Sequence, residues 1–218
     1  MVVVRVLFTG HIGYKFLIWN LFLTWIPLCI SLLMNYIYVS YKRSILRAFV
    51  MLFSVSVWIA FYPNAPYIIT DFIHLSGVDI NFYFTNTVHT MNILIWYDFI
   101  MITLFILTGF LIGFVSLYLI QRLLMDRFNN FIGWIFVASI LFVSSFAIYL
   151  GRFIRWNSWD IITRPKILIN GILGSFHRYP FAFTVTFGLF LILIYCALYY
   201  LTNLNDYKVA FTDRYKIL

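Results

Sequence analysis

The stretch FYPNAPYIITDFIHL, residues 61–75, ends one long apolar run and separates it from the next. Pro63 and Pro66 each remove a backbone donor and disfavour helical geometry in the residue before them, so we expect the helix to stop here. Asp71 and His74 follow, three residues apart, in a chain with only seven acidic residues and four histidines. Because such groups are scarce, the pair marks either a functional edge of the protein or a well-capped loop.

The composition points to lipid as the main solvent of the chain. Of the 218 residues, 64% are hydrophobic, 22% are aromatic and 10% are charged, whereas soluble domains average about 25% charged and about 45–50% apolar residues. The net charge of +8 comes without a basic patch, RNA-binding motif or zinc signature, which excludes nucleic acid as a partner. Basic residues that flank apolar spans instead indicate membrane lipids as partners.

Cys29 and Cys196 both lie inside long apolar runs. This position favours two small core residues over a disulfide or a metal pair. One Asp and one His, such as Asp71 and His74, also fall short of a metal site. We therefore expect neither a metal nor another cofactor.

Five apolar segments are long enough to cross a bilayer, for which about 20 residues are needed. All five are expected to be helical, since backbone polar groups in lipid must be satisfied within the segment. The predicted fold is all-α, a polytopic membrane helix bundle of one domain, residues 1–218. Two long amphipathic or interfacial loops, 63–90 and 151–180, lie on one face of it. The spans are expected at 17–39, 45–62, 91–120, 131–150 and 181–201.

The distribution of Lys and Arg suggests an orientation. Strict alternation places the N-terminal tail, 63–90 and 151–180 on one face, with seven basic residues, and 40–44, 121–130 and the C-terminal tail on the other, which has eight when Arg47 is included. Without 151–180, which carries five, the counts are two and eight. The positive-inside rule then puts the N-terminus outside and the C-terminus in the cytoplasm of a cell that bears the protein in its plasma membrane.

A polar stripe is expected at 64–75 if that segment is helical, because its polar residues are three, four and three residues apart. Asp71 could orient His74 through a ring N–H, which suits a general acid–base pair. The alternative is an Asp–His hydrogen bond that only fixes the loop. The residues of the stripe are Asn64, Tyr67, Asp71 and His74.

A second polar group lies in GRFIRWNSWD, residues 151–160. On a regular α-helix Arg152, Arg155, Trp156 and Trp159 share one face. Two guanidinium groups beside two indoles suit an anionic head group at the lipid boundary. The alternative is an ordinary interfacial anchor of tryptophans and arginines. Two further candidates in the same block are Asn157 and Asp160, and Asp160 could pair with either arginine.

Asp98 lies in WYDF, residues 96–99, about 36 Å along a helix from Arg122. That distance places it near the same membrane boundary as the two long loops. An ionisable residue on a spanning helix is a candidate functional residue and needs a partner, for which we expect Arg152 or Arg155. The alternative is an Asp near a helix N-terminus that the helix dipole stabilises.

These blocks, together with WNLFLTWIPL (19–28), resemble conserved blocks of the bacterial integral membrane proteins grouped as domain of unknown function family 1361. The resemblance covers roughly residues 17–200. It implies a multi-spanning membrane fold in which the named polar residues act as a unit, and it implies no activity.

Two functions of different classes follow. In the first, the cluster binds or processes an anionic lipid or lipid-linked head group, with Asp71 and His74 as the acid–base pair. Asn64, Tyr67, Asp98 and the residues of 152–160 named above then form the binding site. In the second, the chain is an accessory or structural subunit with a membrane protein partner, and the cluster is a salt-bridge network. The sequence leaves enzymatic activity open.

Overall fold

The computed structural model describes residues 1–10, 13–75, 88–155, 163 and 178–204. The predicted all-α fold is confirmed, since the described elements are all helical and include no strand. In chain order they are α1 (Val2–Thr9), α2 (Lys15–Ser40), α3 (Ile45–Phe61), α4 (Asn64–Tyr67), the 3-10 helix η1 (Ile68–Leu75), α6 (Val88–Arg127), α7 (Asn130–Tyr149), the π-helix η2 (Leu150–Ile154) and α10 (Arg178–Thr202).

Five helical stretches of the described chain are long and apolar enough to span a membrane, which makes this a multi-pass membrane protein. They are Lys15–Ser40, Ile45–Leu75, Ile93–Arg127, Asn130–Ile154 and Tyr179–Thr202. In the second, α3 ends at Phe61, just before the prolines as predicted, and the stretch continues through the short helices α4 and η1. Ala65 N–H donates to Tyr62 O at 2.9 Å and Tyr67 N–H to Pro63 O at 3.0 Å, so the chain stays coiled through the break.

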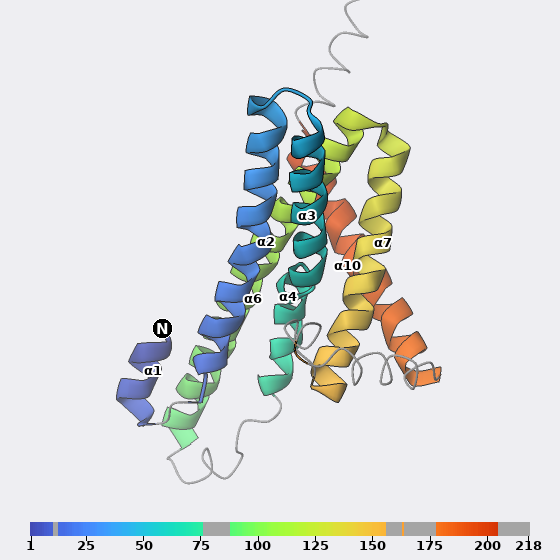
Figure 1. The fold of residues 1–218 in the computed structure, drawn as a ribbon. Helices are drawn as coiled ribbons and strands as arrows, with labels where there is room; N and C mark the ends of the chain where they lie inside the picture. Colours follow the sequence, from blue (N-terminus) through green and yellow to red (C-terminus); the bar gives the residue numbers. More distant parts are fainter. Residues whose placement is uncertain (11–12, 76–87, 156–162, 164–177, 205–218) are drawn as a thin grey trace, which may run out of the picture.

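The helices alternate in direction, as Figure 1 shows. The turns between α2 and α3 and between α6 and α7 lie at one end of the bundle, together with the end of α10. At the other end lie α1, the end of η1, the start of α6 and the end of η2. The described parts of the polar blocks, residues 64–75, 96–99 and 151–155, therefore come to a single end of the bundle.

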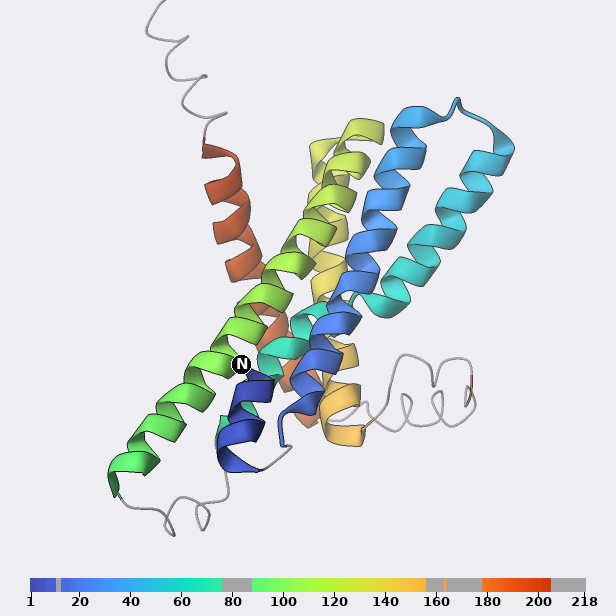
Figure 2. The ribbon, with the colours of Figure 1, turned by 90° about the vertical axis from the view of Figure 1, so that its left-hand side faces the viewer.

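The N-terminal residues, which we treated as a tail, form α1. This helix packs beside the start of α2 and the first turns of α6, which crosses the bundle at a slant (Figures 1 and 2). Val2 and Tyr14 are buried in a small apolar core with Leu17, Ile68 and Met101.

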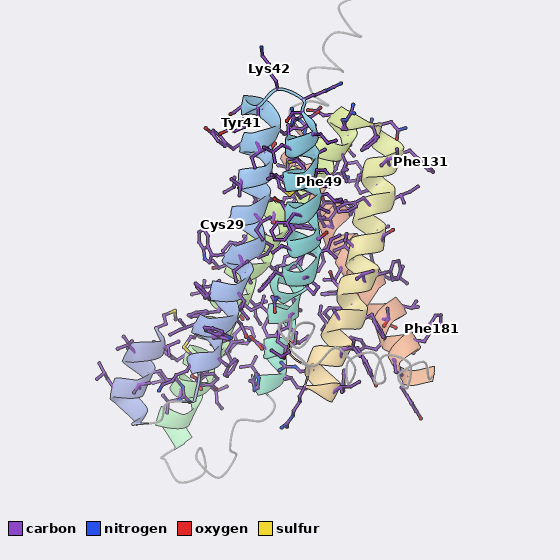
Figure 3. The ribbon with its side chains drawn as sticks, in the orientation of Figure 1. Cys29, Tyr41, Lys42, Phe49, Phe131 and Phe181 are labelled. Carbon is purple, nitrogen blue, oxygen red and sulfur yellow. The ribbon has the colours of Figure 1, made fainter. Side chains whose placement is uncertain are left out.

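The outer surface of the bundle is apolar. Phe131 and Phe181 point away from it, and Lys42 extends from the α2–α3 turn (Figure 3). Cys29 also lies on this surface (Figure 3), so its expected place in the core was wrong. Cys29 and Cys196 are both free thiols.

Two glycines of α6 allow the end of the second span to pack closely. A Cβ on Gly109 would lie 2.7 Å from Ile68 Cδ1, and one on Gly113 would lie 2.6 Å from Ala65 Cβ. Small residues four apart permit such close helix approach in membranes, where packing drives association. The pair Gly109 and Gly113 thus sets how α4 and η1 lie on α6.

We expect Gly113→Ala to destabilise the protein by about 1–3 kcal/mol, because the added methyl group overpacks the contact with Ala65. The measurement is unfolding by SDS titration of the purified protein in detergent. The double variant with Ala65→Gly should recover most of the loss.

Gly13→Ala is the matched control, since a Cβ there meets nothing within 4 Å. Equal stability of the Gly113→Ala and Gly13→Ala variants would contradict the close packing of α4 on α6.

Candidate functional site

Arg152, on η2, is the centre of a polar cluster at the end of the bundle. Its Nη2 donates to the carbonyl oxygen of Thr70 and to Asp71 Oδ1, the latter at 3.3 Å. Its Nη1 lies 3.5 Å from His74 Nε2, and its Cζ lies 5.3 Å from the centroid of the Tyr67 ring. We call Asn20, Tyr67, Thr70, Asp71, His74 and Arg152 the Arg152 cluster.

The winding of η1 explains why one arginine meets several of these residues. A 3-10 helix has three residues per turn, so residues three apart lie directly above one another. Asp71 and His74 have this spacing and both face Arg152. Asp71 and Arg152 thus form an ion pair between the segment after the prolines and the 151–160 block.

Asp71 is wholly buried and also accepts a hydrogen bond from Asn20 Nδ2 of α2, at 2.7 Å. A buried carboxylate is costly unless charges and donors compensate it. Arg152 and Asn20 supply that compensation, so Asp71 joins three elements: α2, η1 and η2.

His74 packs on Phe16, with ring centroids 4.3 Å apart, and its Nε2 faces Arg152. Within the described residues no hydrogen bond joins His74 to Asp71, so the orienting bond expected from their spacing is not formed. Arg152 contacts both instead. A guanidinium can only donate, so His74 Nε2 is the acceptor in this contact. The catalytic roles of Asp71 and His74 stay a prediction.

Asn64, the first residue of the predicted stripe, donates from Nδ2 to Phe61 O at 2.9 Å, at the end of α3. In this contact it satisfies a carbonyl that the helix leaves without an intrahelical donor.

The predicted shared face of Arg152 and Arg155 was wrong. The helix ends at Ile154, and Arg155 takes a left-handed conformation with φ 64° and ψ 40°. Its side chain is exposed, whereas Arg152 is turned into the cluster. Four further predicted site residues, Trp156, Asn157, Trp159 and Asp160, lie outside the described residues.

Asp98 was also given the wrong partner. It pairs with Arg5 of α1, with Nε–Oδ1 at 2.6 Å and Nη2–Oδ2 at 2.9 Å, and Tyr14 donates to Oδ2 at 3.1 Å. Both ion-pair partners are buried. Sequence reasoning overlooked Arg5, although a lone charge in the apolar run VVVRVLF indicates a hidden counter-charge.

Aromatic rings connect the Arg152 cluster to the Arg5–Asp98 ion pair. Tyr14 and Phe16 have ring centroids 6.0 Å apart, and Phe16 packs on His74. No group of three potential metal ligands gathers in the part of the chain that the structure describes. The arrangement is thus two compact ion pairs joined by aromatic contacts, with the exposed Arg155 three residues after Arg152 in the chain.

Residues 19–194 match a family model described as "Protein of unknown function (DUF1361)". The chain belongs to the DUF1361 family. Comparison with curated proteins and with solved structures gave no match. The region shared with the DUF1361 family contains the whole Arg152 cluster, whereas α1 with Arg5 precedes it.

We expect Arg152→Gln to destabilise the protein by about 3 kcal/mol, because the wholly buried Asp71 loses its ionic partner. The double variant Asp71→Asn/Arg152→Gln should be more stable than Arg152→Gln alone. SDS titration of both proteins measures the difference.

Arg127→Gln serves as the control, since Arg127 is exposed at the opposite end of the bundle. Its stability should change by less than about 0.5 kcal/mol. A loss in Arg152→Gln no larger than this would mean that the ion pair does not hold the three elements together.

Proposed function

We propose that this member of the DUF1361 family binds the anionic head group of a lipid or lipid-linked molecule at Arg155, three residues after Arg152. The observation that carries the proposal is Arg155, an exposed arginine in a left-handed backbone conformation. Such a conformation costs a residue with a side chain about 1–2 kcal/mol, and strained residues of this kind gather at functional sites. Arg155 has no ion pair among the described residues, whereas Arg152 is balanced by Asp71.

The depth of the cluster favours a head group as the ligand. From Asn20 to Ser40, the end of α2, the helix is about 30 Å long. This equals the typical thickness of the hydrocarbon core, about 30 Å. With Ser40 at one boundary, Asn20 and Asp71 lie at the other, where lipid phosphates are found.

Arg155 and Arg152 have different roles in the proposed site. Arg155 can donate a fork of hydrogen bonds to a phosphate or carboxylate. Arg152, held by Asp71 and Thr70, fixes the position of η2, whose C-cap is Arg155. We propose binding rather than acid–base chemistry, because the carboxylate of Asp71 is engaged by Asn20 and Arg152.

A structural role is the second candidate. The observation that favours it is the complete burial of Asp71 between α2, η1 and η2. On this reading the cluster braces a subunit that acts with a membrane protein partner, and Arg155 binds nothing.

Substitution of Arg155 separates the two candidates. We expect Arg155→Gln to weaken binding of phosphatidylglycerol about tenfold, because a charge-assisted hydrogen bond contributes about 1.5–3 kcal/mol. Native mass spectrometry of the protein with phosphatidylglycerol or phosphatidylcholine measures this, and melting temperatures should not change. Arg155→Lys should give a smaller loss, since lysine keeps the charge without the fork.

Arg127→Gln, at the other end of the bundle, is the matched control and should retain phosphatidylglycerol binding. Equal binding by wild-type, Arg155→Gln and Arg127→Gln proteins would favour the structural role.

We further propose that the Arg152 cluster faces the outside of the cell and that the C-terminus is cytoplasmic. The positive-inside rule supports this orientation, because the opposite end carries Lys42, Arg43 and Arg47 at the α2–α3 turn and Arg127 at the end of α6.

Thiol labelling in intact cells tests the orientation. In a protein with Cys29→Ala and Cys196→Ala, a cysteine at Thr163 should react with a membrane-impermeant maleimide. A cysteine at Lys42 should react only after the cells are opened. The reverse pattern would invert the orientation without affecting the lipid proposal.

A further inference from the structure

The helix α1 presents its charged residue to the protein and three apolar residues, Val3, Val4 and Leu7, to the outside. Arg5 is 6% exposed and Val2 is 7% exposed, whereas Val3 is 67% and Leu7 is 80% exposed. Val4 also faces outward. A surface helix in water has the opposite arrangement, with apolar residues toward the core and charges toward solvent.

The contacts of Arg5 explain how its charge is tolerated in a helix whose outer face is apolar. Its guanidinium makes the two-pronged contact with Asp98 described above and lies 4.4 Å from the centroid of the Tyr14 ring. Tyr97 Oη donates to Met1 O at 2.8 Å and ties the start of α1 to α6. A charge of this kind in lipid requires such a closed pair.

The outer face of α1 continues the lipid-facing surface of α6. Ile93 and Trp96, in the first turns of α6, are 70% and 64% exposed. Tryptophan is typical of the membrane boundary. α1 lies beside these turns in both views (Figures 1 and 2), so Val3, Val4 and Leu7 extend an apolar surface that already faces lipid.

The turn after α1 permits this position. Gly10 takes a left-handed conformation with φ 69°, and its N–H donates to Val6 O at 2.8 Å. Glycine adopts this conformation without a side-chain clash, so α1 can end at Gly10 and the chain can change direction there.

From these observations we infer that α1 is an interfacial membrane helix. Its outer face, Val3, Val4 and Leu7, lies at the boundary between the head groups and the acyl chains of one leaflet, and the Arg5–Asp98 ion pair latches it to α6. The inference uses the membrane spans and does not depend on head-group binding at Arg155. A second copy of the chain or plain water on this face are the alternatives that the experiment separates.

The first experiment probes the environment of Leu7. In the protein with Cys29→Ala and Cys196→Ala, Leu7→Cys is labelled with the polarity-sensitive dye NBD and placed in phosphatidylcholine nanodiscs. We expect blue-shifted emission, quenching by lipids brominated on the acyl chain, and protection from iodide in solution. Lys42→Cys, at the exposed α2–α3 turn, is the control and should be quenched by iodide instead.

Two results would overturn the inference. Quenching of the Leu7 probe by iodide would place α1 in water. Quenching of the Leu7 probe by neither iodide nor brominated lipid would mean that protein covers this face.

The second experiment tests the latch. In wild-type protein in nanodiscs, amide hydrogen exchange of residues 2–9 should be slow, and Asp98→Asn should raise its rate at least tenfold. Asp126→Asn, an exposed aspartate near the other end of the same helix, should leave the rate unchanged. Should Asp98→Asn not fold, Arg5→Lys removes the fork but keeps the charge, and a rise of several-fold is expected. Unchanged exchange in Arg5→Lys and in any folded Asp98→Asn protein would show that the ion pair does not hold α1.

Discussion

The carboxylate of Asp71 has no exposed surface, yet it lies at the end of a bundle whose surroundings are mainly hydrocarbon. An ion in that environment is stable only with compensating donors, which come here from Asn20 on α2 and Arg152 on η2. Elements far apart in the sequence must therefore meet at this point. Close packing of η1 on Gly109 of α6 brings the fourth element to the same place. The arrangement of the bundle end depends on this one buried charge.

Hydropathy alone predicted the spans. Exposing unpaired backbone N–H and C=O groups to lipid costs free energy, so long apolar segments in a membrane form helices. Alternation of five spans likewise brought the two polar blocks to one end. The prolines at 63 and 66 correctly predicted that the α-helix α3 ends just before them, at Phe61, but the coiled backbone continues beyond them in α4 and η1. A proline lacks its own donor, but Ala65 and Tyr67 still donate to Tyr62 and Pro63. The path thus bends and tightens into a 3-10 helix without stopping.

Within the candidate site, the spacing of residues close in sequence grouped three side chains correctly, whereas the predicted partner of Asp98, far away in sequence, was wrong. Tyr67, Asp71 and His74 are near neighbours in sequence, so any helical winding gathers them. The partner of Asp98 could not be predicted in the same way. That choice depends on α1 folding back onto α6, which short-range patterns do not encode. Nor does any glycine mark the end of η2 at Arg155, so its left-handed turn left no signal in the sequence.

The two buried ion pairs share a consequence for where a ligand can act. Arg5 is neutralised by Asp98 and Arg152 by Asp71, so neither buried cation leaves a net charge to attract an anion over distance. Arg155 is outside both pairs and exposed at the same end. The contacts Tyr14–Phe16 and Phe16–His74 run between the pairs, so the side chains around Arg5 and those around Arg152 form one continuous group of contacts. The head group proposed at Arg155 and the lipid proposed around α1 would lie at this same end of the bundle, and the two proposals are tested separately.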